Sequence, residues 1–198
     1  MAATTSQIGT LGTLGALDAI YRRRATRSYT AAPVDEATVR ELLRAAVHAP
    51  TAMHLEPWAF AIVQDTALLK KISDRAKRLV VPPDGELTRS GSALLGNPEF
   101  NIFYNAGTLI VICGKPMGPF VPADCWLAAE NLMIAATALG LATCPIGLAL
   151  GALAEPELKA ELRIPTEITP LVAIIVGTAA TVPVVSPRRE PEILSWRK

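Results

Sequence analysis

The 198-residue sequence has little of several features that mark common classes of protein. Aromatic residues make up only 5%, and 19 basic residues nearly balance 18 acidic ones. Nucleic-acid-binding proteins need a basic excess or stacking aromatic side chains, so this composition disfavours them. No G-x-G-x-x-G follows a predicted strand and no P-loop occurs, so a Rossmann domain or a nucleoside triphosphatase lacks its phosphate-binding mechanism.

Cysteine and histidine are also scarce. Cys113, Cys125 and Cys144 are odd in number, widely spaced and without a C-x-x-C pair, and the two histidines, His48 and His54, lie far from them in sequence. We therefore expect no metal site and no disulfide framework, and the sequence favours a reducing cytoplasm. Small buried hydrophobes are the expected role of all three cysteines, Cys144 included.

No apolar run continues long enough, without interruption, to favour a membrane span. Glycines and prolines break the two uncharged stretches, 131–154 and 168–187, so we expect pieces of a soluble core and no membrane partner. Residues 1–16 lack a basic start and contain three glycines, which predicts a loosely held arm before a single domain over 17–198. The apolar share, 51%, is high enough to predict a large subunit interface.

Helical and strand patterns alternate along the domain. Between 80 and 105 the periodicity is lost, which predicts a functional lid or a helix that the pattern does not locate. The helix over 122–139 is apolar around nearly its whole circumference, so it is central or lies in a subunit interface. The predicted helices are 17–24, 35–48, 66–79, 122–139 and 156–162, and the predicted strands are 59–63, 108–113 and 171–176.

The chemically suggestive stretch is 23–29, which holds Arg23, Arg24 and Arg27. Three arginines cannot be buried without partners, because an unpaired buried guanidinium is very costly. Planar guanidinium groups bind phosphate through paired N–H bonds, so a phosphate-bearing ligand is one interpretation. A solvated charge run is the other, and this stretch alone does not separate them.

The order of several short motifs resembles the FMN-dependent nitroreductase family over about residues 20–196. Each motif is weak alone, and their order and spacing carry the resemblance. The motifs are R-R-x-x-R-x-Y over 23–29, Pro33-Val34, a helix ending in Ala49-Pro50-Thr51, Pro57-Trp58 entering a strand, Glu130-Asn131-Leu132 in a helix that ends A-x-x-L-G-L, and the basic pair Arg188-Arg189.

The resemblance implies an α+β nitroreductase fold, with a central, mostly antiparallel sheet flanked by helices. It also implies an intertwined homodimer in which a C-terminal segment reaches the partner chain and both chains build each FMN site. NADH or NADPH would supply hydride, and flavin N5 would pass it to a nitroaromatic, quinone or similar acceptor by a ping-pong mechanism. A flavin-consuming or dehalogenating enzyme, or a flavin-binding protein with little turnover, are the alternatives.

The resemblance also assigns roles to residues that match the family's motifs. The phosphate and ribityl contacts would come from Arg23, Arg24 and Arg27, with Arg188 and Arg189 closing on the phosphate. Ala25 stands where a serine is usual, so one hydroxyl contact is missing. Along the flavin from the other chain would lie Pro50, Thr51 and Ala52. The turn over the flavin would be Pro145, Ile146 and Gly147, with the Gly147 N–H directed at N5.

Four further positions remain open at this stage. Asp124 matches a polar position near the cofactor, and a simple helix cap is the alternative. His54 and Glu56 replace the family's Asn and Gln, and either tune substrate choice or have structural roles such as pairing with an arginine. Phe120 is a candidate substrate contact, with core packing as the alternative; the same holds for Met53, Phe100, Phe103 and Tyr104. The segment 115–121 is too short for a large lid.

Overall fold

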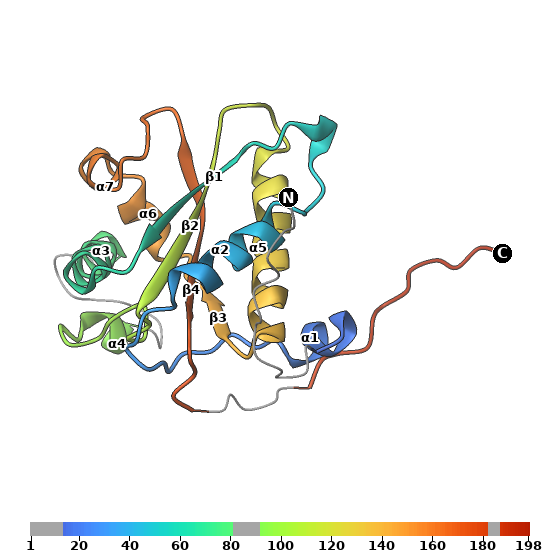
Figure 1. Ribbon diagram of the computed structural model, residues 1–198, viewed down its shortest axis with the longest axis horizontal. Helices are drawn as coiled ribbons and strands as arrows, with labels where there is room; N and C mark the ends of the chain where they lie inside the picture. Colours follow the sequence, from blue (N-terminus) through green and yellow to red (C-terminus); the bar gives the residue numbers. More distant parts are fainter. Residues whose placement is uncertain (1–13, 81–91, 182–186) are drawn as a thin grey trace, which may run out of the picture.

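The centre of the computed structural model, which describes residues 14–80, 92–181 and 187–198, is a four-stranded antiparallel sheet (Figure 1). The strands lie in the order β1-β2-β4-β3. Neighbouring strands are antiparallel throughout, so the α+β class with an antiparallel sheet is confirmed. The strands are β1 (Trp58–Val63), β2 (Thr108–Gly114), β3 (Ala142–Pro145) and β4 (Thr169–Gly177).

The two central strands, β2 and β4, hold the core together. Both are runs of β-branched and other apolar residues, and β2 is buried along its full length. Successive side chains on a strand point to opposite faces, so each strand serves two hydrophobic clusters. Leu109 and Val111 join one cluster, whereas Ile110 and Ile112 join the other. This alternation explains why both strands carry apolar residues on both faces, with Thr108 and Thr169 only at their first positions.

Helices α2 (Glu36–Ala46) and α5 (Val121–Ala138) cover one face of the sheet. The Asp35 carboxylate accepts a hydrogen bond from the Thr38 N–H at 2.9 Å, so Asp35 is the N-cap of α2. The inner side of α5 is built from small and medium residues, and Trp126 on its outer side is 48% exposed. Helix α1 (Ala16–Arg22) packs against α5.

The other face carries α3 (Thr66–Val80), α6 (Ala149–Leu153) and α7 (Pro156–Glu161), with α4 (Ser92–Gly96) near the start of β2 (Figure 1). Helices α3 and α6 pack against each other. A buried loop carrying Ile102 and Phe103 fills the space between α3 and the sheet. Apart from α3, which has 15 residues, the helices on this face are short, whereas α5 on the opposite face has 18 residues.

The sequence patterns located most elements to within two or three residues but missed several. Strand β3 and helix α6 were not predicted, because Pro145 and Gly147 usually interrupt regular secondary structure. The strand predicted over 171–176 is consequently the fourth strand and not the third. Helix α4 lies in the stretch where a hidden helix was one expectation. Leu79, expected to face inward, and the Leu17, Ile20 and Tyr21 face of α1 are exposed.

Some expectations concern residues outside the described part of the chain. The arm expected over 1–16 lies almost wholly there, and α1 begins at Ala16. The 81–91 part of the expected lid also lies there. Among the helices within 14–80, 92–181 and 187–198, none combines the length and apolar character needed to cross a membrane.

Gly107 provides a test of the packing at the start of β2. A Cβ added there would lie 2.5 Å from the Ala31 carbonyl oxygen and 2.7 Å from the Pro33 nitrogen. Because these are backbone atoms that cannot rotate away, Gly107→Ala is expected to lower the free energy of unfolding by about 1–3 kcal/mol. Urea unfolding measures the change. Gly96→Ala is the control, since a Cβ there meets nothing within 4 Å; equal losses in both variants would contradict the prediction.

Candidate functional site

A cavity of about 300 Å³ lies where the arginine stretch, the turn after β3 and the loop before β2 meet. Arg27 contributes the one charged side chain among its described lining residues. The turn contributes Cys144 to Leu148, and the loop before β2 contributes aromatic and aliphatic side chains. The lining residues from that loop and α4 are Leu94, Leu95, Phe100, Ile102 and Tyr104.

The turn after β3 presents an unused backbone donor. The Ile146 N–H donates to the Ala173 carbonyl at 2.8 Å, which anchors the turn to β4. Pro145 has no N–H, and the Gly147 N–H donates to no acceptor within the described residues. A Cβ added at Gly147 would meet nothing within 4 Å, so this residue borders open space. The turn can therefore offer one N–H group to a ligand in the cavity.

The arginine stretch is tied to β3 as an additional strand-like segment. Ala25 forms a parallel bridge with Thr143, and the Thr26 N–H donates to the Thr143 carbonyl at 3.1 Å. Burial raises the pKa of the Cys144 thiol, while Arg27 and Arg23 act in the opposite direction. Both guanidinium groups therefore act on the same part of β3. Arg27 brings positive charge to this end of the cavity, whereas Arg23 lies 3.7 Å from a carboxylate oxygen of Glu130.

Three buried polar atoms near this segment have no hydrogen-bond partner within the described residues: Arg24 Nε, Tyr29 Oη and Thr143 Oγ1. The Arg24 guanidinium is otherwise held by the Tyr21 and Arg23 carbonyls, at 2.6 and 2.8 Å. Burial raises the pKa of Tyr29 far above its usual value, so the phenol stays protonated as a donor. Unused donors near the positive charge of Arg27 fit a ligand that is rich in acceptor oxygens.

A second set of predicted residues lies in the loop from Pro50 to Pro57. Its short helix η1 (Ala52–His54) and the following turn place Met53, His54 and Glu56 in left-handed backbone conformations, with φ of 56°, 53° and 47°. Such conformations are costly outside glycine and persist when surrounding contacts hold them. Asp124 supplies one such contact, because its carboxylate accepts a hydrogen bond from the Ala52 N–H at 3.0 Å.

This contact argues against Asp124 as a simple cap of its own helix, while its place near a cofactor stays a prediction. The N-cap position of α5 is Phe120, and the buried Asp124 side chain bonds the loop and not its own helix. His54 and Glu56 are exposed, and neither forms an ion pair within the described residues, so the expected pairing with an arginine is not seen. Their effect on substrate choice stays a prediction.

The two sets of residues lie at opposite ends of the sheet. Trp58, directly after the loop, pairs with Gly114 at one end of β2, whereas Thr108 at the other end pairs with Val176 near the arginine segment. Figure 1 shows η1 and α1 at opposite ends of α5. One chain therefore does not bring Pro50, Thr51 and Ala52 to the cavity lined by Arg27 and Gly147.

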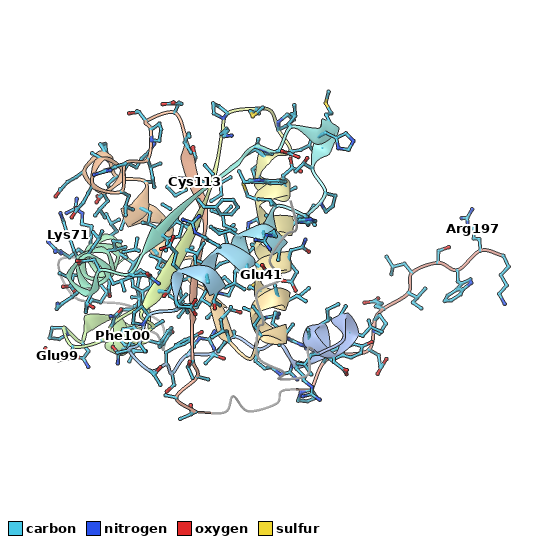
Figure 2. All side chains as sticks on the ribbon, in the orientation of Figure 1. Glu41, Lys71, Glu99, Phe100, Cys113 and Arg197 are labelled. Carbon is cyan, nitrogen blue, oxygen red and sulfur yellow. The ribbon has the colours of Figure 1, made fainter. Side chains whose placement is uncertain are left out.

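Phe100 and Tyr104, two candidate substrate contacts, line the cavity, whereas Phe120 and the basic pair do not. Phe120 is 58% exposed just before α5. Arg188 and Arg189 belong to an exposed tail that extends away from the body of the chain (Figure 1). Figure 2 shows Phe100 and Glu99 on one side of the molecule and Arg197 at the far end of this tail. Trp58 is a core residue, as expected. Leu94, Leu95 and Ile102 were missed as cavity residues, and the only sequence signal was the loss of periodicity around them.

The role of Asp124 can be tested by stability. Asp124→Ala removes the acceptor of the Ala52 N–H and is expected to cost about 1–3 kcal/mol of unfolding free energy. Asp124→Asn keeps an acceptor oxygen and is the matched control, expected to lose less. Chemical denaturation of both variants measures the difference. Equal stability of the Ala and Asn variants would show that the hydrogen bond contributes nothing to holding the loop.

Comparison with known proteins agrees with this geometry. A family model described as the nitroreductase family matches residues 20–178. A putative NADH dehydrogenase/NAD(P)H nitroreductase of Archaeoglobus fulgidus is 31% identical over 137 residues, which are 67% of each chain.

Solved structures agree as well. A Bacteroides fragilis nitroreductase with bound FMN has a TM-score of 0.76 at 25% identity, over 90% of this chain and 96% of that one. Iodotyrosine deiodinase bound to FMN and 3-iodo-L-tyrosine has a TM-score of 0.74 at 21% identity, over 90% and 97%, and shows a shared fold. The match of the family model over most of the chain, together with this fold, means that the chain belongs to the nitroreductase family.

Proposed function

We propose that this chain is an FMN-dependent oxidoreductase that takes hydride from NADH or NADPH and reduces a nitroaromatic, a quinone or a similar acceptor. The observation that carries the proposal is the cavity in which Arg27 meets the unused Gly147 N–H. The names of two relatives, an NAD(P)H nitroreductase and a nitroreductase with bound FMN, support the choice of cofactor and reductant.

The residues of the cavity fit the groups of FMN. Arg27 supplies positive charge in the cavity, and Arg24 nearby in sequence has an unused Nε–H, which suit a phosphate and the hydroxyls of a ribityl chain. Arg23 would join them by exchanging its ion pair with Glu130 for the ligand. Ala25 supplies no hydroxyl, so the phosphate contact would depend more on the arginines. Arg188 and Arg189 would join them only from another chain or after the tail moves, since the tail extends away from this cavity.

When bound, FMN would supply the hydride chemistry at its N5 atom and give ping-pong kinetics. The protein's part is binding and electrostatics. The Gly147 N–H would donate a hydrogen bond at N5, and the arginines would stabilise negative charge in a site that the surrounding apolar side chains keep dry. No nucleophile or acid–base pair is needed for this role. The chemistry thus requires few reactive side chains.

We further propose a homodimer in which each FMN site takes residues from both chains. The separation of the 50–57 loop from the Arg27 cavity within one chain supports this arrangement, since a second chain could supply the missing wall. The outer face of α5 and the apolar side chains of α1 are exposed and would pack in such an interface.

The tail gives a second argument for the dimer. Leu194 is 90% exposed, and Ile193 and Trp196 are also exposed, so their own chain does not bury these apolar side chains. Strand β1 is an edge strand bordered by an apolar groove of about 410 Å³ that its own residues line together with Leu162 to Pro165. An extended tail from a partner would cover such an edge.

The proposal also includes a single domain and a cytoplasmic location, and it leaves out a dehalogenase activity. One domain over 17–198 agrees with a single sheet whose two clusters share β2 and β4. A cytoplasmic location agrees with three buried, free thiols. The likeness to iodotyrosine deiodinase concerns the fold alone, so it does not carry a dehalogenase proposal.

Purified protein tests the function directly. It is expected to be yellow, to release FMN on denaturation, to bleach with NADH or NADPH under argon, and to recolour with a quinone or nitroaromatic. Yellow protein that does not bleach would support a flavin-binding role without turnover. Protein that neither carries FMN nor takes it up on reconstitution would refute the proposal.

The arginine contact has its own prediction. Arg27→Ala should fold normally and bind FMN about 10- to 100-fold more weakly, because a charge-assisted hydrogen bond to phosphate or ribityl oxygen is lost. Fluorescence titration of FMN into apoprotein measures the affinity. Arg40→Ala, which removes an exposed arginine that pairs only with Glu36 on α2, is the control. Unchanged affinity in Arg27→Ala would place this arginine outside the site.

Light scattering with size-exclusion chromatography tests the dimer. The expected mass is twice the 21.0 kDa of one chain. Trp126→Glu places a charge on the exposed face of α5 and should shift the protein toward monomers with reduced FMN occupancy. A wild-type monomer with full FMN occupancy would exclude a site shared between chains.

A further inference from the structure

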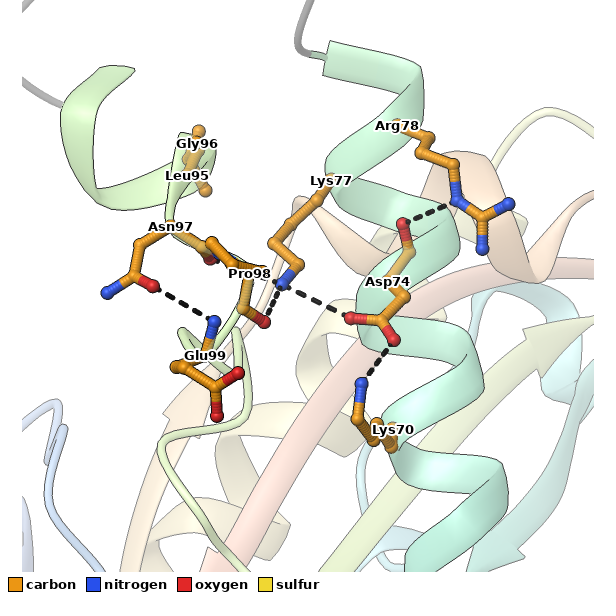
Figure 3. A pocket seen from close by; sticks show the side chains of 9 residues that line it. All are labelled: Lys70, Asp74, Lys77, Arg78, Leu95, Gly96, Asn97, Pro98 and Glu99. Atoms are coloured by element: carbon orange, nitrogen blue, oxygen red, sulfur yellow. Dashed lines mark hydrogen bonds and ion pairs between the residues drawn. The ribbon is translucent and has the colours of Figure 1, made fainter.

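The loop that forms one wall of the cavity is held in place by a buried lysine on α3. Lys77 is only 7% exposed, and its ammonium donates to the Phe100 carbonyl at 2.8 Å and the Pro98 carbonyl at 3.0 Å, with the Asn97 carbonyl at 3.4 Å. It also lies 3.2 Å from a carboxylate oxygen of Asp74 (Figure 3). An ammonium has three N–H donors, so these contacts leave none for a ligand.

Because all its donors are used, Lys77 offers none to a ligand in the cavity beside it. The cavity, about 690 Å³, lies between α3 and residues 95–99, and its lining is rich in charge. Lys70 and Lys77 share the single Asp74 carboxylate, and the Arg78 Nε–H donates to the Asp74 backbone carbonyl at 3.3 Å (Figure 3). The donors of Lys77 are used by the loop carbonyls and by Asp74, so Lys77 serves the loop. We assign no ligand to this cavity.

A second buried group of α3 holds the same loop further along. The Ser73 hydroxyl accepts a hydrogen bond from the Ile102 N–H at 3.1 Å, and both groups are buried. Ser73 and Lys77 are four residues apart, so they lie on the same face of the helix. Two consecutive turns of α3 thus fix the loop from Asn97 to Ile102.

The backbone after this fixed segment is strained. Tyr104 and Asn105 have φ of 51° and 63°, conformations that non-glycine residues adopt only when their surroundings impose them. The Tyr104 ring packs edge-to-face on Phe100, with ring centres 5.6 Å apart. Phe100, Ile102 and Tyr104 line the cavity that also contains Gly147. The position of this wall depends on the contacts that hold the loop.

We propose that Lys77 is a positioning residue that sets the shape of the acceptor site. By binding the Asn97, Pro98 and Phe100 carbonyls it fixes the edge-to-face rings of Phe100 and Tyr104 in the wall beside the Gly147 turn. This wall limits the space that an aromatic acceptor can enter. The inference rests on the proposed function, since it concerns the same cavity. Lys77 itself contacts neither acceptor nor cofactor.

The test compares Lys77→Met with Lys70→Met. Both substitutions remove a cation from Asp74, but only Lys77 contacts the loop, whereas Lys70 is exposed. Steady-state rates are measured with NADH and two acceptors: menadione, a planar quinone that must enter the cavity, and ferricyanide, which accepts single electrons without an aromatic site.

In Lys77→Met the KM for menadione should rise about tenfold, because a small displacement of the Phe100 and Tyr104 wall has effects of this size. The rate with ferricyanide and the amount of bound FMN should stay near those of the wild type. Lys70→Met should match the wild type with both acceptors. Equal menadione KM values in the two variants would overturn the role of Lys77, even with an active wild type. A wild type that never takes up FMN would instead refute the proposed function, and this inference with it.

Hydrogen exchange gives a readout that does not need the loaded enzyme. In flavin-free protein, the backbone amides of Ile102 to Tyr104 should exchange faster in Lys77→Met than in Lys70→Met. Exchange that is unchanged in Lys77→Met would overturn the inference. If Lys77→Met does not fold, Ser73→Ala, which removes the acceptor of the Ile102 N–H, takes its place with the same expected outcomes.

Discussion

The arrangement of the candidate site depends on one short contact between the arginine segment and β3. The Thr26 N–H donates to Thr143, and two more bonds, from Thr30 to Thr178 and from Ala180 to Ser28, continue the pairing beyond β4. These bonds fix the path of the backbone, so Arg27 stands beside the turn after β3 with no side-chain hydrogen bond or ion pair to the described residues. Arg23, in contrast, lies 3.7 Å from a carboxylate oxygen of Glu130, and the Arg24 guanidinium donates to the Tyr21 and Arg23 carbonyls. Arg27 is therefore the arginine that the backbone pairing leaves available to a ligand. The positive charge of the site is thus organised by the sheet.

The sequence predicted the elements with strong periodicity well. Helices α2, α3 and α5 and strands β1, β2 and β4 have long apolar patterns, and the N-cap at Asp35 has an unambiguous local signal. Strand β3 was missed because it is four residues long and ends in proline, a residue that usually argues against a strand. Its place at the sheet edge tolerates Pro145, but edge position is a tertiary property that a local pattern does not contain.

The candidate site was predictable only in part. The resemblance supplied Arg27 and the 145–147 turn, and the structure places both in one cavity. The roles of Asp124 and Lys77 follow from partners 72 and more than 20 residues away in sequence, so no local pattern identifies them. For Arg188, Arg189 and the 50–57 loop, the sequence motifs predicted more than the structure of one chain contains. These residues matched family motifs, yet a single chain does not bring them to the cavity; in the proposed homodimer they would reach it from the second chain.

The open edge of β1 has a consequence for the biogenesis of the protein. During synthesis, β1 leaves the ribosome long before the tail over 187–198, and at 5–20 residues per second the interval is on the order of ten seconds. Throughout that time the nascent chain carries an uncovered strand edge with apolar side chains beside it, a known template for mispairing. If the tail of a partner covers this edge, as proposed above, the yield of native protein depends on how quickly finished chains meet.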